Sequence, residues 1–419
     1  MSIRRYASST HMIYGIFAFV SCWYFYFAST FTLRPFPHLF WIFMAILSVF
    51  FSVLQKYKLD RIDQLFFLGM VILMLISVVS VNQIGSMRYV ANYVIYYIVA
   101  RMIAKNCEGK IIFKIILVFS VFHMICIYIQ VLIPAIYISV LMPLLPASAH
   151  TMLTEQMNWN AAYYGFSIQS SMSAMYISIG AILAALKVRD NRKKLIRIFY
   201  LILTVLFLIA TFYTQRRGSS VVTLVVLMLI YLKTKGSTVS KILFGITVIL
   251  LIAVIGIQNI PGMAGIMNKF TTFIATGSLM NGRDSNFADA IIAIGKRPIC
   301  GYGGGQVKTA TGYAWLENSY LSILVQWGVI GAIAFFVPYL SQVKKTIFQN
   351  KFNKSNNIYI SFSSYIQILF FLMSLVENYF GEPLNIFIYF LIVFTGNRYG
   401  ANNKLLYEDL NMNEVCNAK

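Results

Sequence analysis

The sequence predicts an all-α, polytopic integral membrane protein, and composition, apolar runs and charge placement carry that prediction. Hydrophobic residues make up 59% of the 419 residues and charged residues only 11%, whereas a soluble domain carries about a quarter charged residues. Runs such as 195–213 and 239–257 approach the ~20 apolar residues that cross about 30 Å of hydrocarbon. The number of such runs excludes a soluble domain with one anchor.

The apolar runs predict about twelve spans in a single membrane domain, 1–419. We place them at about 12–33, 38–55, 64–82, 86–104, 111–133, 161–186, 195–213, 218–232, 239–257, 316–341, 357–376 and 382–395. The eighth and twelfth runs are short and leave room for a further helical turn. No small-residue cleavage site follows the first run, so we expect an uncleaved first helix.

The orientation of the spans follows from the short loops, because Lys and Arg favour the cytoplasmic side. Basic residues gather at Arg4 and Arg5 and in alternate connections, at 56–61, 101–114, 187–197, 233–241, 344–354 and 398–404. The other connections are nearly bare, and the loop 134–160 has no Lys or Arg. We therefore expect both termini in the cytoplasm and a long external loop, 258–315, between the ninth and tenth spans.

Several other classes of protein and site are excluded. The net charge of +21 does not indicate nucleic-acid binding, because the bases lie between spans and form no single patch. The five cysteines imply neither a disulfide framework nor a zinc site. The expected external loops hold few acids and no clustered carboxylates, so we expect no metal and no cofactor. Those acids are Glu155, Asp284, Asp289, Glu317, Glu377 and Glu382.

Arg216 and Arg217 break the charge pattern, because they lie in a very short external turn between two apolar spans. Two explanations are open: a functional role, or snorkelling of both side chains to lipid phosphates. His123 lies within a predicted span. We interpret it as a helix-packing group whose hydrogen bonds are satisfied, with a catalytic base as the alternative.

The second half of the expected external loop predicts a short amphipathic helix at the membrane surface. Asp284 or Ser285 suits its N-cap, and its apolar positions recur at helical spacing: Phe287, Ala290, Ile291 and Ile294. Gly295, Pro298 and Gly301 are expected to end it. The glycines of 301–305 follow, and they either let backbone approach a sugar or diphosphate closely or form a flexible hinge.

Glu317 lies where the loop enters the tenth predicted span. A carboxylate there is either a charge that caps the helix N-terminus or a general base at the outer membrane surface.

Four short motifs in the C-terminal half resemble the O-antigen ligase and polymerase superfamily, most closely the Wzy polymerases. They are 215–218, 282–283, 296–303 and 317–321, the last followed by Gly328 and Gly331. The N-terminal half is similar only in helix number and hydropathy. In ligases the segment that matches Glu317 and Asn318 usually begins with His, so this departure favours a polymerase of O-antigen or capsular polysaccharide.

A single direct displacement supported by fixed guanidinium groups would need no metal and would invert the anomeric carbon. The resemblance implies a glycosyltransferase on the outer face of the bacterial plasma membrane. Its substrates would be oligosaccharides linked to undecaprenyl diphosphate. Arg217 is the first candidate to stabilise the leaving diphosphate, followed by Arg216 and Arg283, and Glu317 is the candidate base. The residues expected to bind substrate are Lys296, Arg297, Asn318, Tyr320 and Gly303.

Other functions remain open. An O-antigen ligase would transfer the same chain to the lipid A core, and a polymerase of the teichuronic-acid type would differ only in its sugar. A transporter or flippase also suits about twelve spans, but the halves show no obvious repeat and intramembrane charges are sparse. A scaffold is a further alternative. Besides lipid-linked sugars, the expected partners are membrane lipids and a chain-length regulator.

Overall fold

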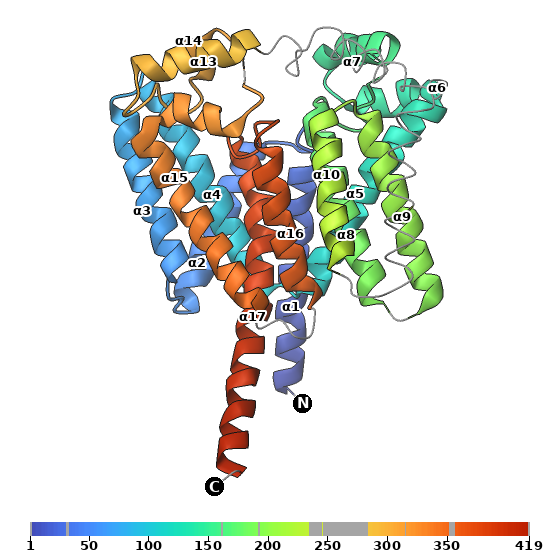
Figure 1. Ribbon diagram of the computed structural model, residues 1–419, viewed down its shortest axis with the longest axis vertical. Coiled ribbons are helices and arrows are strands. Elements are labelled where there is room, and N and C mark those ends of the chain that lie inside the picture. Colours follow the sequence, from blue (N-terminus) through green and yellow to red (C-terminus); the bar gives the residue numbers. More distant parts are fainter. Residues whose placement is uncertain are drawn as a thin grey trace. The chain divides into compact units, whose positions relative to one another are not determined.

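The computed structural model describes residues 2–30, 33–160, 162–191, 193–233, 245, 284–314, 316–351 and 357–417. Every regular element in these residues is helical (Figure 1). The α-helices are α1 (Ser2–Tyr26), α2 (Pro37–Leu54), α3 (Arg61–Val78), α4 (Gln83–Asn106), α5 (Gly109–Leu132), α6 (Pro134–Ile136), α7 (Ala147–Asn160), α8 (Ser170–Asp190), α9 (Lys194–Tyr213), α10 (Arg217–Leu232), α13 (Asp284–Lys296), α14 (Val307–Thr311), α15 (Ser319–Lys351), α16 (Ile358–Met373) and α17 (Pro383–Asn417). A π-helix, Tyr137–Leu141, and a 3-10 helix, Met142–Leu144, follow α6.

Length and composition let six of the described helices cross a membrane. They are α2, α3, α5, α8, α9 and the Ser319–Phe348 part of α15. Four more apolar helical stretches are shorter, at Met12–Tyr26, Pro134–Leu144, Arg217–Leu232 and Ile358–Met373. The predicted fold class, an all-α polytopic membrane protein, is therefore confirmed. The count of about twelve spans stays a prediction, and the ninth, 239–257, lies outside the described residues.

The chain divides into two compact units. The first unit comprises residues 1–15, 38–109 and 285–419, and the second comprises 16–37 and 110–284. In the first unit α3 packs on α15, and α17 packs on both α4 and α16. The rings of Phe66 and Tyr97 stack there with centroids 3.7 Å apart. In the second unit α8 packs on α9 and α10, and the hydroxyls of Ser178 and Thr223 lie 2.7 Å apart between α8 and α10.

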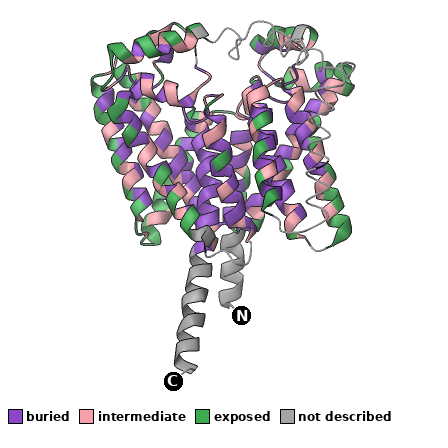
Figure 2. Cartoon of the chain, viewed as in Figure 1, coloured by how far each residue is buried: buried purple, intermediate pink, exposed green. Residues whose placement is uncertain are grey.

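The helices differ in how much of their apolar surface is covered (Figure 2). Most of α8 is buried, whereas α2 buries only Trp41, Met44 and Ser48. The outward side chains of α2 include Ile46 and Val53, which are 62% and 71% exposed. A helix that is apolar all round, yet exposed on most faces, suits contact with lipid rather than water.

Several element boundaries differ from the predicted spans: α1 ends at Tyr26 rather than at 33, and α15 and α17 continue past 341 and 395 to Lys351 and Asn417. Two further differences lie before and at the start of α8. Residues 134–160, expected as a loop, form α6, the π- and 3-10 helices and α7. The predicted sixth span begins at 161, but α8 begins at Ser170 because residues 162–169 are not helical. Gly165 has a φ of 58°, and its N–H donates to the Gln130 side chain at 2.7 Å. This contact comes from a distant helix, α5, so the apolar content of the segment did not reveal it.

Candidate functional site

A break in α15 organises one end of the first unit. Gly328 has φ 62° and ψ −168° inside the helix, so the helical hydrogen bonds across it are lost. The preceding loop replaces them. Tyr302 and Gly303 donate their N–H groups to the carbonyls of Val325 and Gln326 at 3.0 and 2.7 Å. In return, the N–H of Val329 donates to the carbonyl of Pro298 at 2.8 Å. The break therefore leaves these backbone groups bonded.

This exchange explains the glycine-rich segment 301–305. Gly301, Gly303 and Gly305 all have positive φ, a conformation that glycine adopts at little cost. A Cβ on Gly303 would overlap Ser80 and Ser86, which follow α3 and begin α4. The glycines thus permit close packing of the loop on three helices. Gly303 is buried and packs against Ser80 and Ser86. Its contact with substrate stays a prediction.

The residues at the start of α15 connect that helix to the turn between α16 and α17. Asn318 caps the helix by accepting from the Leu321 N–H at 3.0 Å, and it donates to the carbonyl of Leu375 at 3.0 Å. The Ser319 hydroxyl donates to the carbonyl of Glu377 at 3.0 Å and accepts from the N–H of Phe380 at 3.1 Å. Because Asn318 supplies the cap, Glu317 is not needed for that purpose.

The same turn, 374–382, also contacts α4. Tyr93 donates its hydroxyl to the carbonyls of Phe380 and Gly381 at 3.1 and 3.2 Å, and Tyr89 also bonds Gly381. Glu382 ends the turn just before α17 begins. Its side chain reaches solvent, yet the protein atoms crowded around its other sides exclude water and raise its pKa to about 7. Glu317 and Glu382 are therefore two carboxyls at one end of the first unit.

Ser319 and the crowding around Glu382 were not found by sequence reasoning. Tyr320, a predicted substrate residue, donates its hydroxyl to the carbonyl of Phe371 on α16 at 2.9 Å. The serine hydroxyl and the tyrosine hydroxyl both satisfy backbone carbonyls of a segment more than fifty residues away. No local pattern signals such contacts, although the apolar run of α16 does signal a helix near them.

The helix expected before the glycine-rich segment is present as α13. Ala290 and Ala293 are buried against a cluster that includes Leu316 and Val325. Ile291, expected on the same apolar face, is instead 62% exposed, and Ile292 is 54% exposed. The buried face therefore includes both alanines, and Ile294 packs against the same cluster. The two exposed isoleucines remain on the outer face of the helix.

The two predicted cations at the end of α13, Lys296 and Arg297, are both exposed. The guanidinium of Arg297 lies over the ring of Tyr302, with 5.1 Å from Cζ to the ring centroid. This contact, a cation–π interaction, holds Arg297 beside the glycine-rich loop. Lys296 ends α13 in its last turn, where a cation is favoured by the helix dipole. Arg283 and Trp315 lie outside the described residues.

In the second unit, a three-residue turn places the arginine pair at the start of α10. Gln215 has a φ of 58° in this turn, and α9 ends at Tyr213 just before it. Arg216 donates from Nε to the Ser170 hydroxyl at 2.6 Å, and Ser170 is the first residue of α8. The carbonyl of Arg216 accepts from the Ser220 N–H at 2.9 Å. Arg216 is thus fixed to a second helix.

The electrostatics of this helix start favour an anion. The first N–H groups of α10 point outward at its positive end, where cations are disfavoured and anions are stabilised. Arg216 and Arg217 nevertheless lie there, and both are partly exposed. Two guanidinium groups beside a helix N-terminus form the donor arrangement that phosphate oxygens accept.

His123, the candidate packing group within a predicted span, lies in α5. His123 is fully buried, with its Nε2 3.0 Å from the carbonyl of Tyr26. It is surrounded by aromatic rings, including Tyr176 at 4.7 Å between centroids. This burial agrees with a helix-packing group, but the buried Nδ1 has no hydrogen-bond partner among the described residues, so the expectation that its hydrogen bonds are all satisfied is not met. Within the described part of the chain, no group of three or more His, Cys, Asp or Glu side chains is arranged to hold a metal ion.

The family model described as O-antigen ligase matches residues 202–336. The matched stretch runs from α9 through the arginine pair, α13 and the glycine-rich loop into the broken helix α15. It therefore contains all four motifs that carry the resemblance. This supports the O-antigen ligase and polymerase superfamily without separating polymerases from ligases. No curated protein matches the chain.

Proposed function

We propose that this chain, whose residues 202–336 carry the O-antigen ligase family match, polymerises lipid-linked oligosaccharide repeat units. It transfers the growing chain from undecaprenyl diphosphate to a new lipid-linked repeat on the outer face of the bacterial plasma membrane. The observation that carries the proposal is the arginine pair at the start of α10, inside the matched stretch. A diphosphate leaving group needs fixed positive charge, and this helix start supplies it.

The reaction is a single displacement. The acceptor hydroxyl oxygen attacks the anomeric carbon of the donor sugar, and the bond from that carbon to the diphosphate oxygen breaks. The hydroxyl proton passes to a carboxylate of the protein, and undecaprenyl diphosphate leaves with the bonding electron pair. Attack opposite the leaving group inverts the anomeric carbon. Breaking the activated diphosphate bond supplies the driving force, so no nucleotide is required.

Arg217 is the residue we assign to the diphosphate first, and Arg216 supports it. A guanidinium matches two phosphate oxygens at once and keeps its charge at every physiological pH. The bond from Arg216 to Ser170 fixes one of the two groups before substrate arrives, which reduces the reorganisation needed as charge develops. Arg283 remains a further proposed contact for the diphosphate.

Two carboxyls are candidates for the base. Glu317 is the one assigned from the motif. Asn318 caps the N-terminus of α15, so Glu317 is not required as the cap, and this supports the assignment. Glu382 is the second candidate, because a base works best when its pKa lies near the operating pH and desolvation by neighbouring protein atoms raises the pKa of Glu382 to about 7. Asn318, Tyr320 and Gly303 make fold contacts, so direct contact of these residues with substrate is a proposal alone.

Polymerase is preferred to ligase because Glu317 replaces the usual His of ligases. The exposed Lys296 and Arg297 would raise the local concentration of anionic lipid-linked substrates. Lipid-linked oligosaccharides and membrane lipids are therefore the proposed partners, with a chain-length regulator as a further one. A flippase is the alternative of another class, and it would show no synthesis by purified protein.

The test is a gel of surface polysaccharide from cells that lack the gene and receive variants on plasmids. We expect Arg217→Ala and Glu317→Gln each to reduce the amount of polymer in the ladder at least about a hundredfold, because removal of one oxyanion-type donor or of a general base slows a reaction by such a factor. The matched controls are Arg61→Ala and Glu155→Gln, which remove exposed charges elsewhere. Immunoblots of membranes check that all four variants are present at the wild-type level.

Each pattern of products has one meaning. Single attached repeats in the deletion strain, restored to a ladder only by wild type and the controls, would support a polymerase. Loss of every attached chain, with long lipid-linked polymer accumulating, would show a ligase. Repeat units trapped on the cytoplasmic face would show a flippase. A normal ladder in both Arg217→Ala and Glu317→Gln would disprove the site assignment.

A further inference from the structure

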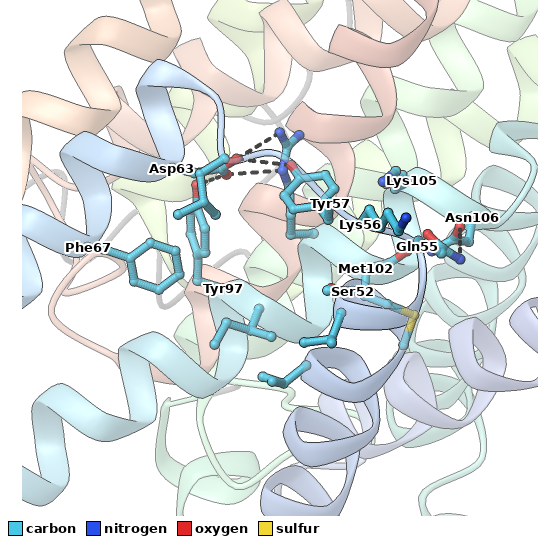
Figure 3. A pocket seen from close by; sticks show the side chains of 15 residues that line it. Ser52, Gln55, Lys56, Tyr57, Asp63, Phe67, Tyr97, Met102, Lys105 and Asn106 are labelled. Atoms are coloured by element: carbon cyan, nitrogen blue, oxygen red, sulfur yellow. Dashed lines mark hydrogen bonds and ion pairs between the residues drawn. The ribbon is translucent and has the colours of Figure 1, made fainter.

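A pocket of about 260 Å³ lies at one end of the first unit (Figure 3). It is enclosed by the end of α2, the turn 55–60, the start of α3 and the last turns of α4. The other ends of α3 and α4 carry the glycine-rich loop, through Val81 and Ser86. The pocket is therefore separate from the site assigned to glycosyl transfer, at the membrane face where the sequence places the cytoplasm.

The acidic groups at this pocket are neutralised by neighbours. Asp63 is fully surrounded: its carboxylate accepts from Tyr57 at 2.9 Å and Tyr97 at 2.7 Å, and it lies 3.1 Å from Arg101. Asp60 lies 2.9 Å from Arg101 and 3.3 Å from Lys345. Arg101 thus serves the two carboxylates and contributes little net positive charge to the cavity.

Two further cations line the pocket, and neither forms an ion pair with a described carboxylate. Lys56 belongs to the turn, and Lys105 belongs to the last turn of α4. The Lys105 ammonium lies 4.0 Å from the centroid of the Tyr57 ring, which holds it over the pocket. In Figure 3 both lysines are drawn on the side of the pocket with Gln55 and Asn106, away from Asp63. The cavity therefore carries a localised excess of positive charge.

Lys56 adopts a backbone conformation that is unusual for a lysine. The N–H groups of Lys56 and Tyr57 donate to the carbonyls of Val53 and Ser52, each at 3.0 Å, which is the Schellman pattern that ends a helix. Lys56 occupies the left-handed position of that motif, with a φ of 47°. Glycine is the usual residue there, because a Cβ is disfavoured in this conformation. A lysine therefore occupies a backbone position that glycine would adopt with less strain.

The remaining wall of the pocket is apolar and opens beside the exposed face of α2. It consists of Val49, Val53, Leu59, Phe67, Ile98 and Met102. Val49, Val53 and Leu59 are 48%, 71% and 51% exposed, and they continue the outward apolar surface of α2. A ligand that satisfies both walls needs one anionic end and one hydrocarbon end.

We propose that this pocket binds one anionic phospholipid, with Lys56 and Lys105 on the headgroup phosphate and an acyl chain along Val49, Val53 and Met102. The acyl chain of this lipid would stay in the bilayer, so the lipid would reach the pocket by lateral diffusion within its own leaflet. A free phosphate ion would leave the apolar wall unused. The inference does not depend on the proposed glycosyl transfer.

The experiment uses the purified full-length chain in a neutral detergent. Native mass spectrometry counts bound lipid after titration with phosphatidylglycerol, with phosphatidylcholine as the neutral comparison. We expect wild type to retain one phosphatidylglycerol that phosphatidylcholine does not replace. Removal of either cation, by Lys56→Gly or Lys105→Met, should lower the bound fraction about fivefold, the factor expected for one basic group at an anionic lipid surface.

Two features of the variants separate lost binding from lost folding. Lys56→Gly removes the ammonium and relieves the left-handed strain, so its melting temperature should equal or exceed that of wild type. Lys58→Gln is the matched control, because Lys58 is exposed in the same turn but does not line the pocket. We expect Lys58→Gln to bind phosphatidylglycerol as wild type does.

Three outcomes would overturn the proposal. The first is equal loss of phosphatidylglycerol from Lys58→Gln, which would mean general attraction to basic residues. The second is wild-type binding of phosphatidylglycerol by both single variants, Lys56→Gly and Lys105→Met. The third is displacement of the lipid by millimolar inorganic phosphate, which would mean that the pocket takes a free phosphate ion.

Discussion

At the scale of the residue, backbone strain and the candidate sites coincide. Three described non-glycine residues have positive φ: Phe36, Lys56 and Gln215. Lys56 lines the lipid pocket, and Gln215 directly precedes the arginine pair. Such conformations cost free energy and persist where the surrounding structure holds them, often at binding sites. At both positions the strained turn sets the direction of a cationic side chain at a helix end.

Glu382 leads to a prediction about pH. A carboxyl with a pKa of about 7 is mostly protonated at pH 6 and mostly ionised at pH 8, so its carboxylate form increases about tenfold between them. If the carboxylate is the active form, polymer synthesis by wild-type protein in liposomes should rise by about that factor from pH 6 to pH 8. We expect Glu382→Gln to be slower and to lose this rise.

The control for that measurement is Glu155→Gln, which should keep the wild-type profile. Identical pH profiles for wild type and Glu382→Gln would show that Glu382 does not set the protonation step. Glu317 would then remain as the candidate base.

At the scale of the element, the break in α15 is built by partner exchange. Loop residues 298–303 take the place of the lost helical hydrogen bonds, and Gly328 lets the two backbones touch. A Cβ at Gly328 would overlap the carbonyl of Ile299, and its φ of 62° disfavours other residues. The start of α15 is therefore held in place both by this break and by Ser319.

Gly328→Ala should destabilise the protein by about 2 kcal/mol or more, because strain and a backbone overlap add. In detergent, the melting temperature of this variant should be several degrees lower than that of wild type. Gly295→Ala is the matched control, because a Cβ there meets nothing within 4 Å in α13, and helix propensity favours Ala by up to about 1 kcal/mol. Equal melting temperatures for the two variants would contradict the packing role of Gly328.

At the scale of the whole molecule, the membrane orientation is still a prediction from charge asymmetry. The glycine-rich loop end of the first unit should face outward, and the turn 55–60 should face the cytoplasm. Cys300 is partly exposed near the first of these ends, and Lys58 is exposed at the second. These two positions therefore report opposite sides of the membrane.

A protein that keeps only Cys300 should react with a membrane-impermeant maleimide in intact spheroplasts. A protein in which Lys58→Cys is the only cysteine should react only after the membrane is permeabilised. The reverse pattern would invert the topology and would move the arginine pair and Glu317 to the cytoplasmic side. The proposed chemistry on the outer face would then be wrong.

The sequence by itself determined the fold class, the places of most long helices and the presence of α13. These features depend on hydrophobicity and on periodicity within one segment, which neighbouring residues specify locally. The burial of His123 also followed, because the residue lies within an apolar run that packs among other helices.

Only the tertiary structure decided what the motif residues contact. The glycine-rich loop bonds a helix about 25 residues later, Arg216 bonds Ser170 on α8, and Ser319 bonds the turn before α17. The same holds for the pKa of Glu382 and for the pocket lined by Lys56. Each depends on which distant segments pack together, and hydrogen bonding and desolvation act through space, so no local pattern in the chain encodes them.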